Sequence, residues 1–435
     1  MVTSNDGGVF FSSDVNHPEP SFREINKDYN TLQFYTCALG PDQAEPHYLG
    51  GTQDDGTLYY NGSSLSMNSM VAGGDGSFCC FDQTINRPLI VSAFYNSYYF
   101  FPDGIITQYA DFKWTGIFIN PADYDYLNHT LYANAVTYDQ VYPGSIVVIS
   151  GIPYQPVGQI LDLNTGTDVP FSILKVSPFS EQDNTTLFLG TQSGRCYKAI
   201  HLQDDPDISD IGSSKFPAAN LSCIDIGESE QELLVTFSNF GVASVWLSLD
   251  GGNTWMNKEG TLPDIPVRWG VFHQENTHQV MLATELGVWV TEDIRATDVL
   301  WSQSGDGLPN VRTDMVRIRK SDNKTLAATH GRGIFTTTYP VALPEIPTPE
   351  TTLTISPNPA PHTIHITGGS EIEQKATIRI YSRDGHLELS QSINCTHETA
   401  DHQLDISFLA DGIYLLTFTH GAYTETGKLI KIPSY

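Results

Sequence analysis

Carboxylates beside glycine-rich turns are the residues of this sequence best suited to chemistry. Asp54 and Asp55 lie within residues 50–57, and Asp75 lies within the turn 73–76. Paired carboxylates serve as the acid and base of glycoside hydrolysis, or they bind sugar hydroxyls. The same side chains also accept hydrogen bonds from their own turns, a role that needs no ligand. We therefore carry forward three interpretations of these aspartates: turn formation, binding and catalysis.

Arg268 and the adjacent Trp269 form a second candidate pair. A Trp ring stacks on the face of a sugar and Arg donates to polar ligand groups, so the pair suits a glycan site. The alternative interpretation is that both side chains pack between neighbouring repeat units.

Oxygen-bearing side chains at alternate positions, Asp162, Asn164 and Asp168, resemble the start of a calcium loop. Gly166 stands where a third ligand would be expected, and no bidentate Glu follows at the right distance. A hairpin turn is the favoured interpretation, and calcium is the alternative. We predict no other metal and no cofactor.

The elements that position these residues repeat along the chain. A strand ending in Thr, followed by a short polar turn, recurs at Thr191, Thr236, Thr284 and Thr329, with spacings of 45, 48 and 45 residues. The mark also occurs near Thr3 and Thr52, and weaker units lie between Thr52 and Thr191. One four-stranded blade per period fits this spacing. The predicted fold is all-β, with a seven- or eight-bladed β-propeller over residues 1–339.

Propeller geometry assigns the candidates to one face. In a four-stranded meander, the turns between the second and third strands share a face with the connections between blades. Asp54 and Asp55 come from turns between second and third strands, whereas Asp75, Arg268 and Trp269 come from connections between blades. We call this side the funnel face, and we predict that any ligand site lies there.

An eight-residue turn, residues 248–255, supports the propeller prediction. It resembles the Asp-box of BNR-repeat β-propellers, which occurs in sialidases, xyloglucanases and sortilin-like receptors. The resemblance implies a structural role on the opposite face, between the third and fourth strands of a blade. The residues that fill the family positions are Ser248, Asp250, Gly252, Thr254 and Trp255.

The resemblance to these families does not extend to a catalytic site. A sialidase uses three arginines around its substrate carboxylate, and no subset of the chain's arginines has the expected spacing. Xyloglucanase-like enzymes use a cleft between two propellers, whereas one is predicted here. We favour a non-catalytic module that binds a glycan or a surface protein, with a glycoside hydrolase, or a fragment of one, as the alternative.

Composition limits the partners. The formal net charge of −28 repels phosphate backbones, so nucleic-acid binding is not expected. No apolar run approaches ~18 residues, so no membrane span is expected.

The six cysteines predict buried free thiols, with a Cys196–Cys223 bridge as the alternative. The first residues lack signal-peptide features and enter the repeat in mid-blade, which suggests a missing upstream segment. The alternative is that the chain closes on itself, with the first and last blades completing each other.

The composition changes after residue 339. Prolines punctuate residues 340–351, a pattern typical of an extended linker. Residues 352–435 alternate as about seven short strands and predict a small immunoglobulin-like β-sandwich. Four motifs within it, at 355–360, 378–385, 409–414 and 428–431, resemble the C-terminal sorting domain of type IX (Por) secretion cargo.

That resemblance has implications for partners and location. Residues 352–435 would engage the type IX secretion machinery, and the protein would be secreted or held on the outer surface of a Gram-negative bacterium. Cargo of this kind enters the periplasm through a signal peptide, so the resemblance also favours a missing upstream segment.

Overall fold

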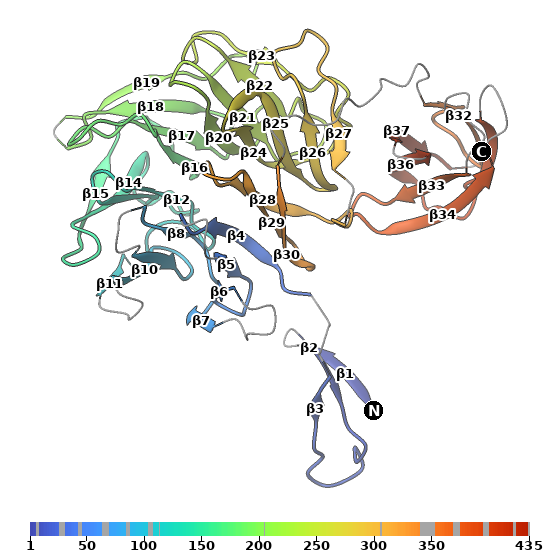
Figure 1. Cartoon of the computed structure of the whole chain (residues 1–435), viewed down its shortest axis with the longest axis horizontal. Helices are drawn as coiled ribbons and strands as arrows, with labels where there is room; N and C mark the ends of the chain where they lie inside the picture. Colours follow the sequence, from blue (N-terminus) through green and yellow to red (C-terminus); the bar gives the residue numbers. More distant parts are fainter. Residues whose placement is uncertain are drawn as a thin grey trace.

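The computed structural model is all-β (Figure 1). The structure describes residues 1–5, 8–25, 31–41, 46–62, 69–83, 88–102, 108–112, 114–203, 205–304, 307–339, 353–368, 375–394, 400–420 and 423–433. The predicted linker, 340–351, lies outside these residues. Within them, no helix is long and apolar enough to cross a membrane.

Seven antiparallel sheets, blades 1 to 7 in chain order, form a ring. The innermost strands are β4 (Phe34–Leu39), β8 (Cys79–Phe81), β12 (Ala122–Asp125), β16 (Phe171–Val176), β20 (Leu221–Ile226), β24 (Val267–His273) and β28 (Thr313–Ile318). The second strands are β5 (His47–Thr52), β9 (Leu89–Ser92), β13 (Thr130–Asn134), β17 (Leu187–Thr191), β21 (Leu233–Phe237), β25 (Asn276–Thr284) and β29 (Lys324–Thr329).

The third and fourth strands complete each blade. The third strands are β6 (Thr57–Asn61), β10 (Ser97–Phe101), β14 (Ser145–Ser150), β18 (Cys196–Ile200), β22 (Val245–Ser248), β26 (Gly287–Thr291) and β30 (Gly333–Thr338). The fourth are β7 (Ser69–Ala72), β11 (Gln108–Asp111), β15 (Val157–Asp162), β19 (Asp207–Asp210), β23 (Met256–Asn257) and β27 (Ser302–Ser304). Blade 7 has three strands among the described residues.

The ring closes because β28 packs against β4 as closely as β24 packs against β28. Apolar clusters fill the spaces between blades, and the cluster around Phe34 and Met315 joins blade 1 to blade 7. The prediction of a propeller is therefore confirmed, and the ring has seven blades.

The repeated Thr has a physical role. Thr52, Thr284 and Thr329 are fully buried, and each hydroxyl donates across its turn to the carbonyl oxygen of the glycine that precedes or begins the third strand, at 2.6–2.8 Å. At Thr191 the hydroxyl accepts instead, from the amide of Arg195 at 2.9 Å. The side chain thus closes the turn between the second and third strands.

A bulge recurs at the start of the innermost strand. In five blades the register of this strand against the second one shifts past a single residue. The residues passed over are Tyr35, Ser172, Ser222, Arg268 and Asp314. Bulges re-aim side chains, and this one places its residue at the end of the strand that opens on the funnel face.

Residues before the ring form a sheet of their own. It contains β1 (Val2–Asn5), β2 (Gly8–Phe11) and β3 (Arg23–Glu24), which pair only with one another within the described part of the chain. Figure 1 shows this sheet standing away from the blades.

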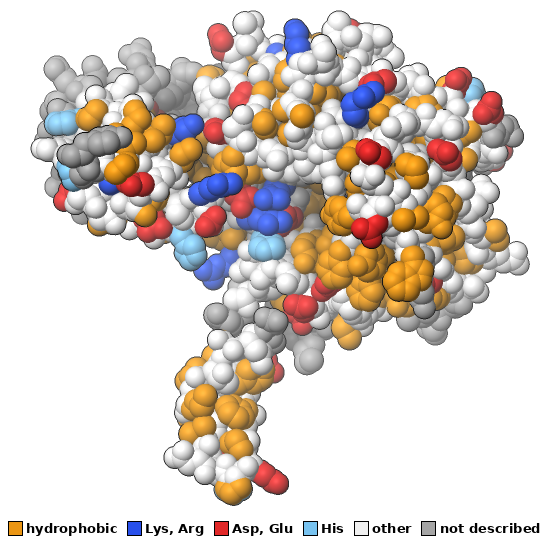
Figure 2. All heavy atoms as spheres, turned by 180° about the vertical axis from the view of Figure 1, so that it is seen from behind, with side chains coloured by type: hydrophobic (Ala, Val, Ile, Leu, Met, Phe, Trp, Pro, Cys, Tyr) orange, Lys and Arg blue, Asp and Glu red, His pale blue; other side chains and the backbone are white. Residues whose placement is uncertain are grey.

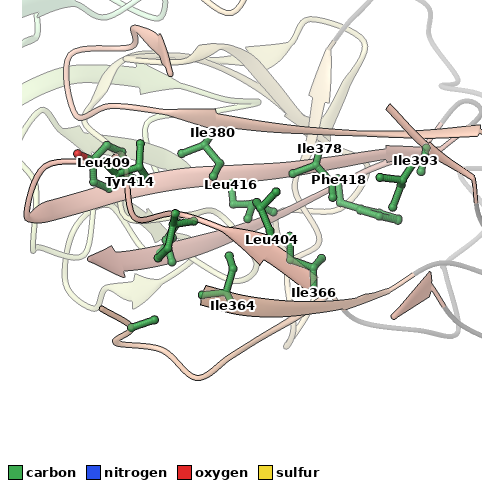
Figure 3. Packing of buried hydrophobic residues seen from close by; sticks show 14 residues of the cluster. Ile364, Ile366, Ile378, Ile380, Ile393, Leu404, Leu409, Tyr414, Leu416 and Phe418 are labelled. Carbon is green, nitrogen blue, oxygen red and sulfur yellow. The ribbon is translucent and has the colours of Figure 1, made fainter. Parts of the chain in front are cut away.

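The C-terminal region is a two-sheet sandwich. One sheet has the order β31-β32-β35 and the other β34-β33-β36-β37. Ile364, Ile366 and Leu404 of the first sheet meet Ile378, Leu416 and Phe418 of the second in a core separate from the ring (Figure 3). The strands are β31 (Thr354–Ser356), β32 (Thr363–Gly368), β33 (Lys375–Tyr381), β34 (Leu387–Asn394), β35 (Ala400–Asp405), β36 (Gly412–His420) and β37 (Tyr423–Lys431).

The described cysteines are free thiols, as the favoured prediction expects, and all of them except Cys80 are buried. Cys196 and Cys223 are both buried and unbridged, so the alternative of a bridge between them is wrong. The Cys223 thiol instead lies 3.3 Å from the carbonyl oxygen of Gly270 in the next blade. Cys395 lies outside the described residues.

Candidate binding face

The funnel face carries two different surfaces. In Figure 2, the C-terminal domain lies at one side, Lys, Arg and His side chains gather next to it, and hydrophobic side chains gather further away. The side-chain contacts described below place the first surface on blades 5 to 7 and the second on blades 2 and 3.

Asp54 and Asp75 come together, and a turn-type hydrogen bond joins them. The backbone amide of Asp54 donates to Oδ1 of Asp75. The two turns approach so closely that a Cβ on Gly76 would lie 2.4 Å from the carbonyl oxygen of Gly56. Burial, followed by the charge of Asp54, raises the pKa of Asp55. The Asp75 carboxylate therefore links its own turn to the turn that carries Asp54.

Tyr35 is a residue of this face that sequence analysis missed. Burial raises its pKa, and the carboxylates of Asp75 and Asp54 raise it further. The Arg312 guanidinium lowers this pKa, and the Asp314 carboxylate raises it. Arg312 donates to Oδ1 of Asp314 at 2.7 and 2.9 Å. Tyr35 therefore lies between the paired turns and the charged side of the funnel. Its position in a bulge, unmarked in the sequence, brings it there.

Arg268 and Trp269 point to different partners. The Arg268 guanidinium donates to Oε2 of Glu285 at 2.6 and 3.1 Å. Trp269 packs against three apolar clusters, and the guanidinium of Arg317 lies 4.8 Å from its ring centroid. Each side chain thus has a structural partner of its own.

Exposed aromatic rings cover blades 2 and 3. Phe94 and Tyr95 lie in the turn between β9 and β10, and Phe118 lies in the connection to blade 3. The Phe94 and Phe118 rings stack at 5.8 Å, and Tyr95 meets both edge-on. All three are at least 40% exposed, and Trp114 in the same connection is 87% exposed. We call these four residues the aromatic group.

Buried asparagines support the aromatic group from below. Asn96, Asn120 and Asn134 are 0–2% exposed and bond to one another. Asn120 Nδ2 donates to Asn96 Oδ1 at 2.7 Å, and Asn134 Nδ2 donates to Asn120 Oδ1 at 3.0 Å. Asn96 also donates to Thr115 at 2.9 Å. A satisfied buried network of this kind fixes the loops above it.

The residues resembling an Asp-box form a tightly bonded turn on the opposite face. Ser248 Oγ donates to Asp250 at 2.9 Å, and Thr254 donates to the same carboxylate through its amide and hydroxyl at 2.8 and 2.6 Å. These hydrogen bonds lower the pKa of the Asp250 carboxyl, and the bond from the Thr254 hydroxyl has the largest effect. Gly252, at a φ of 92°, supplies a conformation that other residues rarely adopt. The Asp250 carboxylate therefore accepts its hydrogen bonds from residues of its own turn.

The tryptophans that follow such turns tie blades together. Trp255 Nε1 donates to the carbonyl oxygen of Ile211 at 2.7 Å, and Trp301 Nε1 donates to that of Lys258 at 3.0 Å. Each acceptor belongs to the connection that follows the preceding blade. This repeated contact gives the spacing of these tryptophans a structural reason.

At the suggested calcium segment, Asp162 accepts from the amide of Asn164 at 2.8 Å, and Gly166 has a φ of 66°. Asp168 lies in the same connection between blades 3 and 4. Among the residues that the structure describes, no group of three or more His, Cys, Asp or Glu side chains could hold a metal ion.

A cavity of about 240 Å³ opens on the other face between blades 3 and 4, lined by Asp123 and Lys175 among others. Burial raises the pKa of Asp123. Lys175 contacts Asp225 at 3.1 Å, and the carboxylates of Asp225 and Asp123 raise its pKa against the effect of burial. Asp123 and Asp225 also accept backbone amides at 2.8 and 2.9 Å, so these charges tie the blades together.

The C-terminal domain lies against the funnel face of blades 5 to 7. Tyr381 accepts from Asn310 at 3.0 Å, and the Arg383 guanidinium lies 5.1 Å from the ring centroid of Phe240. Lys428 lies 3.8 Å from Asp264, and Leu415 packs against the blade 5–6 core. These contacts come from turns and connections of the funnel face only, so this domain covers part of that face.

Comparison with known proteins identifies the C-terminal domain. Residues 354–432 match the secretion system C-terminal sorting domain, the Por secretion tail. No curated protein matches the chain by sequence. The match of residues 354–432 indicates that the protein is secreted by the type IX route, and the fold described above makes it a β-propeller protein.

Solved structures with similar architecture share little sequence. PorZ of Porphyromonas gingivalis, described as an essential surface component of the type IX secretion system, has a TM-score of 0.48 and 11% identity; the match covers 98% of this chain and 63% of that one. The C-terminal WD40 domain of Sif2 gives 0.46 and 13%, covering 76% and 89%. BBS1N, solved with ARL6DN, gives 0.48 and 12%, covering 72% and 98%.

Proposed function

We propose that this protein is a non-catalytic binding module, delivered by type IX secretion to the outer surface of a Gram-negative bacterium, and that it binds a glycan or a surface protein through the funnel face. The observation that carries the proposal is the aromatic group, because large rings exposed together on one surface mark interaction sites. The propeller supplies a rigid support, and the sorting domain supplies the route outward.

The state of the predicted acidic and basic residues supports binding over catalysis. Asp75 accepts from the Asp54 amide, and Arg268 is paired with Glu285. A hydrolase needs an acid and a base free to reach a glycosidic bond. The resemblance of residues 248–255 to an Asp-box fits a BNR-type blade in this proposal, with a structural role for Asp250.

The purified chain incubated with a panel of polysaccharides and with isolated surface proteins tests the proposal. We expect retention on one of these ligands without release of new reducing ends. Release of reducing ends that is abolished by Asp54→Asn or Asp75→Asn would support the glycoside hydrolase alternative instead. Failure to retain any ligand on the panel would also contradict the proposal.

A further inference from the structure

We infer that the aromatic group, Phe94, Tyr95, Trp114 and Phe118, is the binding platform for a neutral polysaccharide. This inference rests on the proposed function and assigns it a site and a ligand class. The four side chains come from the turn of blade 2 and the connection to blade 3. Ring contacts among Phe94, Tyr95 and Phe118 join these two loops into one surface, and Trp114 lies in the same connection as Phe118.

Backbone conformation holds rings outward at this surface. Tyr95 and Trp114 have φ values of 58° and 69°, a region that L-residues occupy rarely, and Tyr142 in the neighbouring turn of blade 3 has 58°. Such conformations persist only where the surroundings impose them, and they gather at functional sites. Trp114 and Tyr138 are 87% and 67% exposed, so the rings face solvent instead of the core.

The loops are fixed before any ligand arrives. The Tyr95 amide donates to Phe118 O at 2.8 Å, and the Gly116 amide donates to Ala135 O at 3.0 Å, so three loops are joined. Beneath them lies the network of Asn96, Asn120 and Asn134. A platform held by packing and by buried hydrogen bonds loses little entropy on binding.

The surroundings select an uncharged, hydroxyl-rich ligand. The turn that carries Asp75 adjoins the aromatic group, because a Cβ on Gly74 would lie 3.1 Å from the Phe94 ring. A carboxylate next to aromatic rings can accept hydrogen bonds from sugar hydroxyls while the rings stack on the apolar faces of sugar units. The chain's charge of −28 disfavours uronic-acid or sulfated polymers, so the ligand is a neutral glycan.

Calorimetric titration of the intact chain with dextran, mannan and laminarin, and with alginate as the acidic polymer, tests the inference. We expect one neutral polymer to bind and Trp114→Ala to weaken it about tenfold or more, whereas Trp114→Phe retains most of the affinity. Tyr154→Ala, which removes a 57% exposed ring from the opposite face, is the matched control and should bind as the unmodified chain does.

The outcomes separate the inference from the proposed function. Binding of a neutral polymer that is unaffected by Trp114→Ala and by the double variant Phe94→Ala/Phe118→Ala would overturn the site and leave the binding function intact. Equal or tighter binding of alginate would overturn the neutral class. Binding of a surface protein with none of the polymers bound would overturn the inference alone, whereas release of reducing ends would overturn the proposed function.

Discussion

The two sides of the funnel face use their side chains in opposite ways. On blades 5 to 7, Arg268 and Asp314 are paired with charges, Trp269 is packed, and the sorting domain lies over the turns. On blades 2 and 3, polar asparagines are buried and aromatic rings are exposed. The strands of these blades keep an ordinary apolar core, whereas in the loops above them polar side chains are buried and large rings are exposed, which is the pattern of an interaction surface.

The strongest test of this contrast is a pair of Trp substitutions. Trp269→Ala should lower the free energy of unfolding by about 3–5 kcal/mol, because its ring packs against three clusters. Trp114→Ala should change it by no more than about 0.5 kcal/mol, because the ring is 87% exposed. Urea denaturation of both variants measures the difference. Similar losses in the two would mean that the rings on blades 2 and 3 are structural.

The asparagine network gives the next largest effect. Asn120→Ala should cost about 2–3 kcal/mol, since it leaves the buried Asn96 and Asn134 side chains without a shared partner. It should also weaken ligand binding by loosening the loops. Asn220→Ala is the matched control, because Asn220 lies in the corresponding connection two blades on and is only partly buried. An Asn120 variant as stable as this control would show that the network does not support the surface.

A pH test addresses Glu259, on the part of the funnel face that the sorting domain covers. Burial raises the pKa of Glu259 from 4.5 to about 7. Between these values the folded chain keeps a proton that the unfolded chain has released, so stability should fall by about 2 kcal/mol as the pH rises from 4.5 to 7. Glu259→Gln keeps the acceptor for the Ser244 amide and should remove this slope. An unchanged slope in thermal unfolding between pH 4.5 and 8 would contradict the assignment.

The smallest effect concerns the contact between domains. Arg383→Ala removes a cation–π contact with Phe240, worth about 0.5–1 kcal/mol, and should raise cleavage between the domains in limited proteolysis. Arg379→Ala, on the same sandwich, is the comparison variant. Equal cleavage of the two would mean that Arg383 does not help to hold the domain on the ring.

The sequence predicted the propeller because one residue repeats for a physical reason. A buried Thr closes the turn between the second and third strands, and its spacing is visible without coordinates. The sandwich was predicted equally well, since its turns and alternating strands follow local rules. The sheet β1–β3 could not be placed outside the ring, because its strands carry the same mark as a blade.

The candidate site was predicted less completely. The sequence brought Asp54 and Asp75 to one face, but the bond between them depends on how two glycine turns pack. Phe94 and Tyr95 are no different in composition from Tyr98 and Phe100, which are fully buried. Only the position of the turn and the left-handed backbone at Tyr95 separate the exposed rings from the core.

Hydroxyl-radical footprinting of the intact chain and of the chain without its sorting domain tests the division of the funnel face most directly. We predict that removal increases oxidation at Phe240, which contacts Arg383, and at Leu286, whose side chain lies 3.8 Å from a Cβ built on Gly385. It should leave oxidation at the exposed Phe94, Tyr95 and Trp114 unchanged. Unchanged labelling at Phe240 and Leu286, or increased labelling at the aromatic group, would contradict the account.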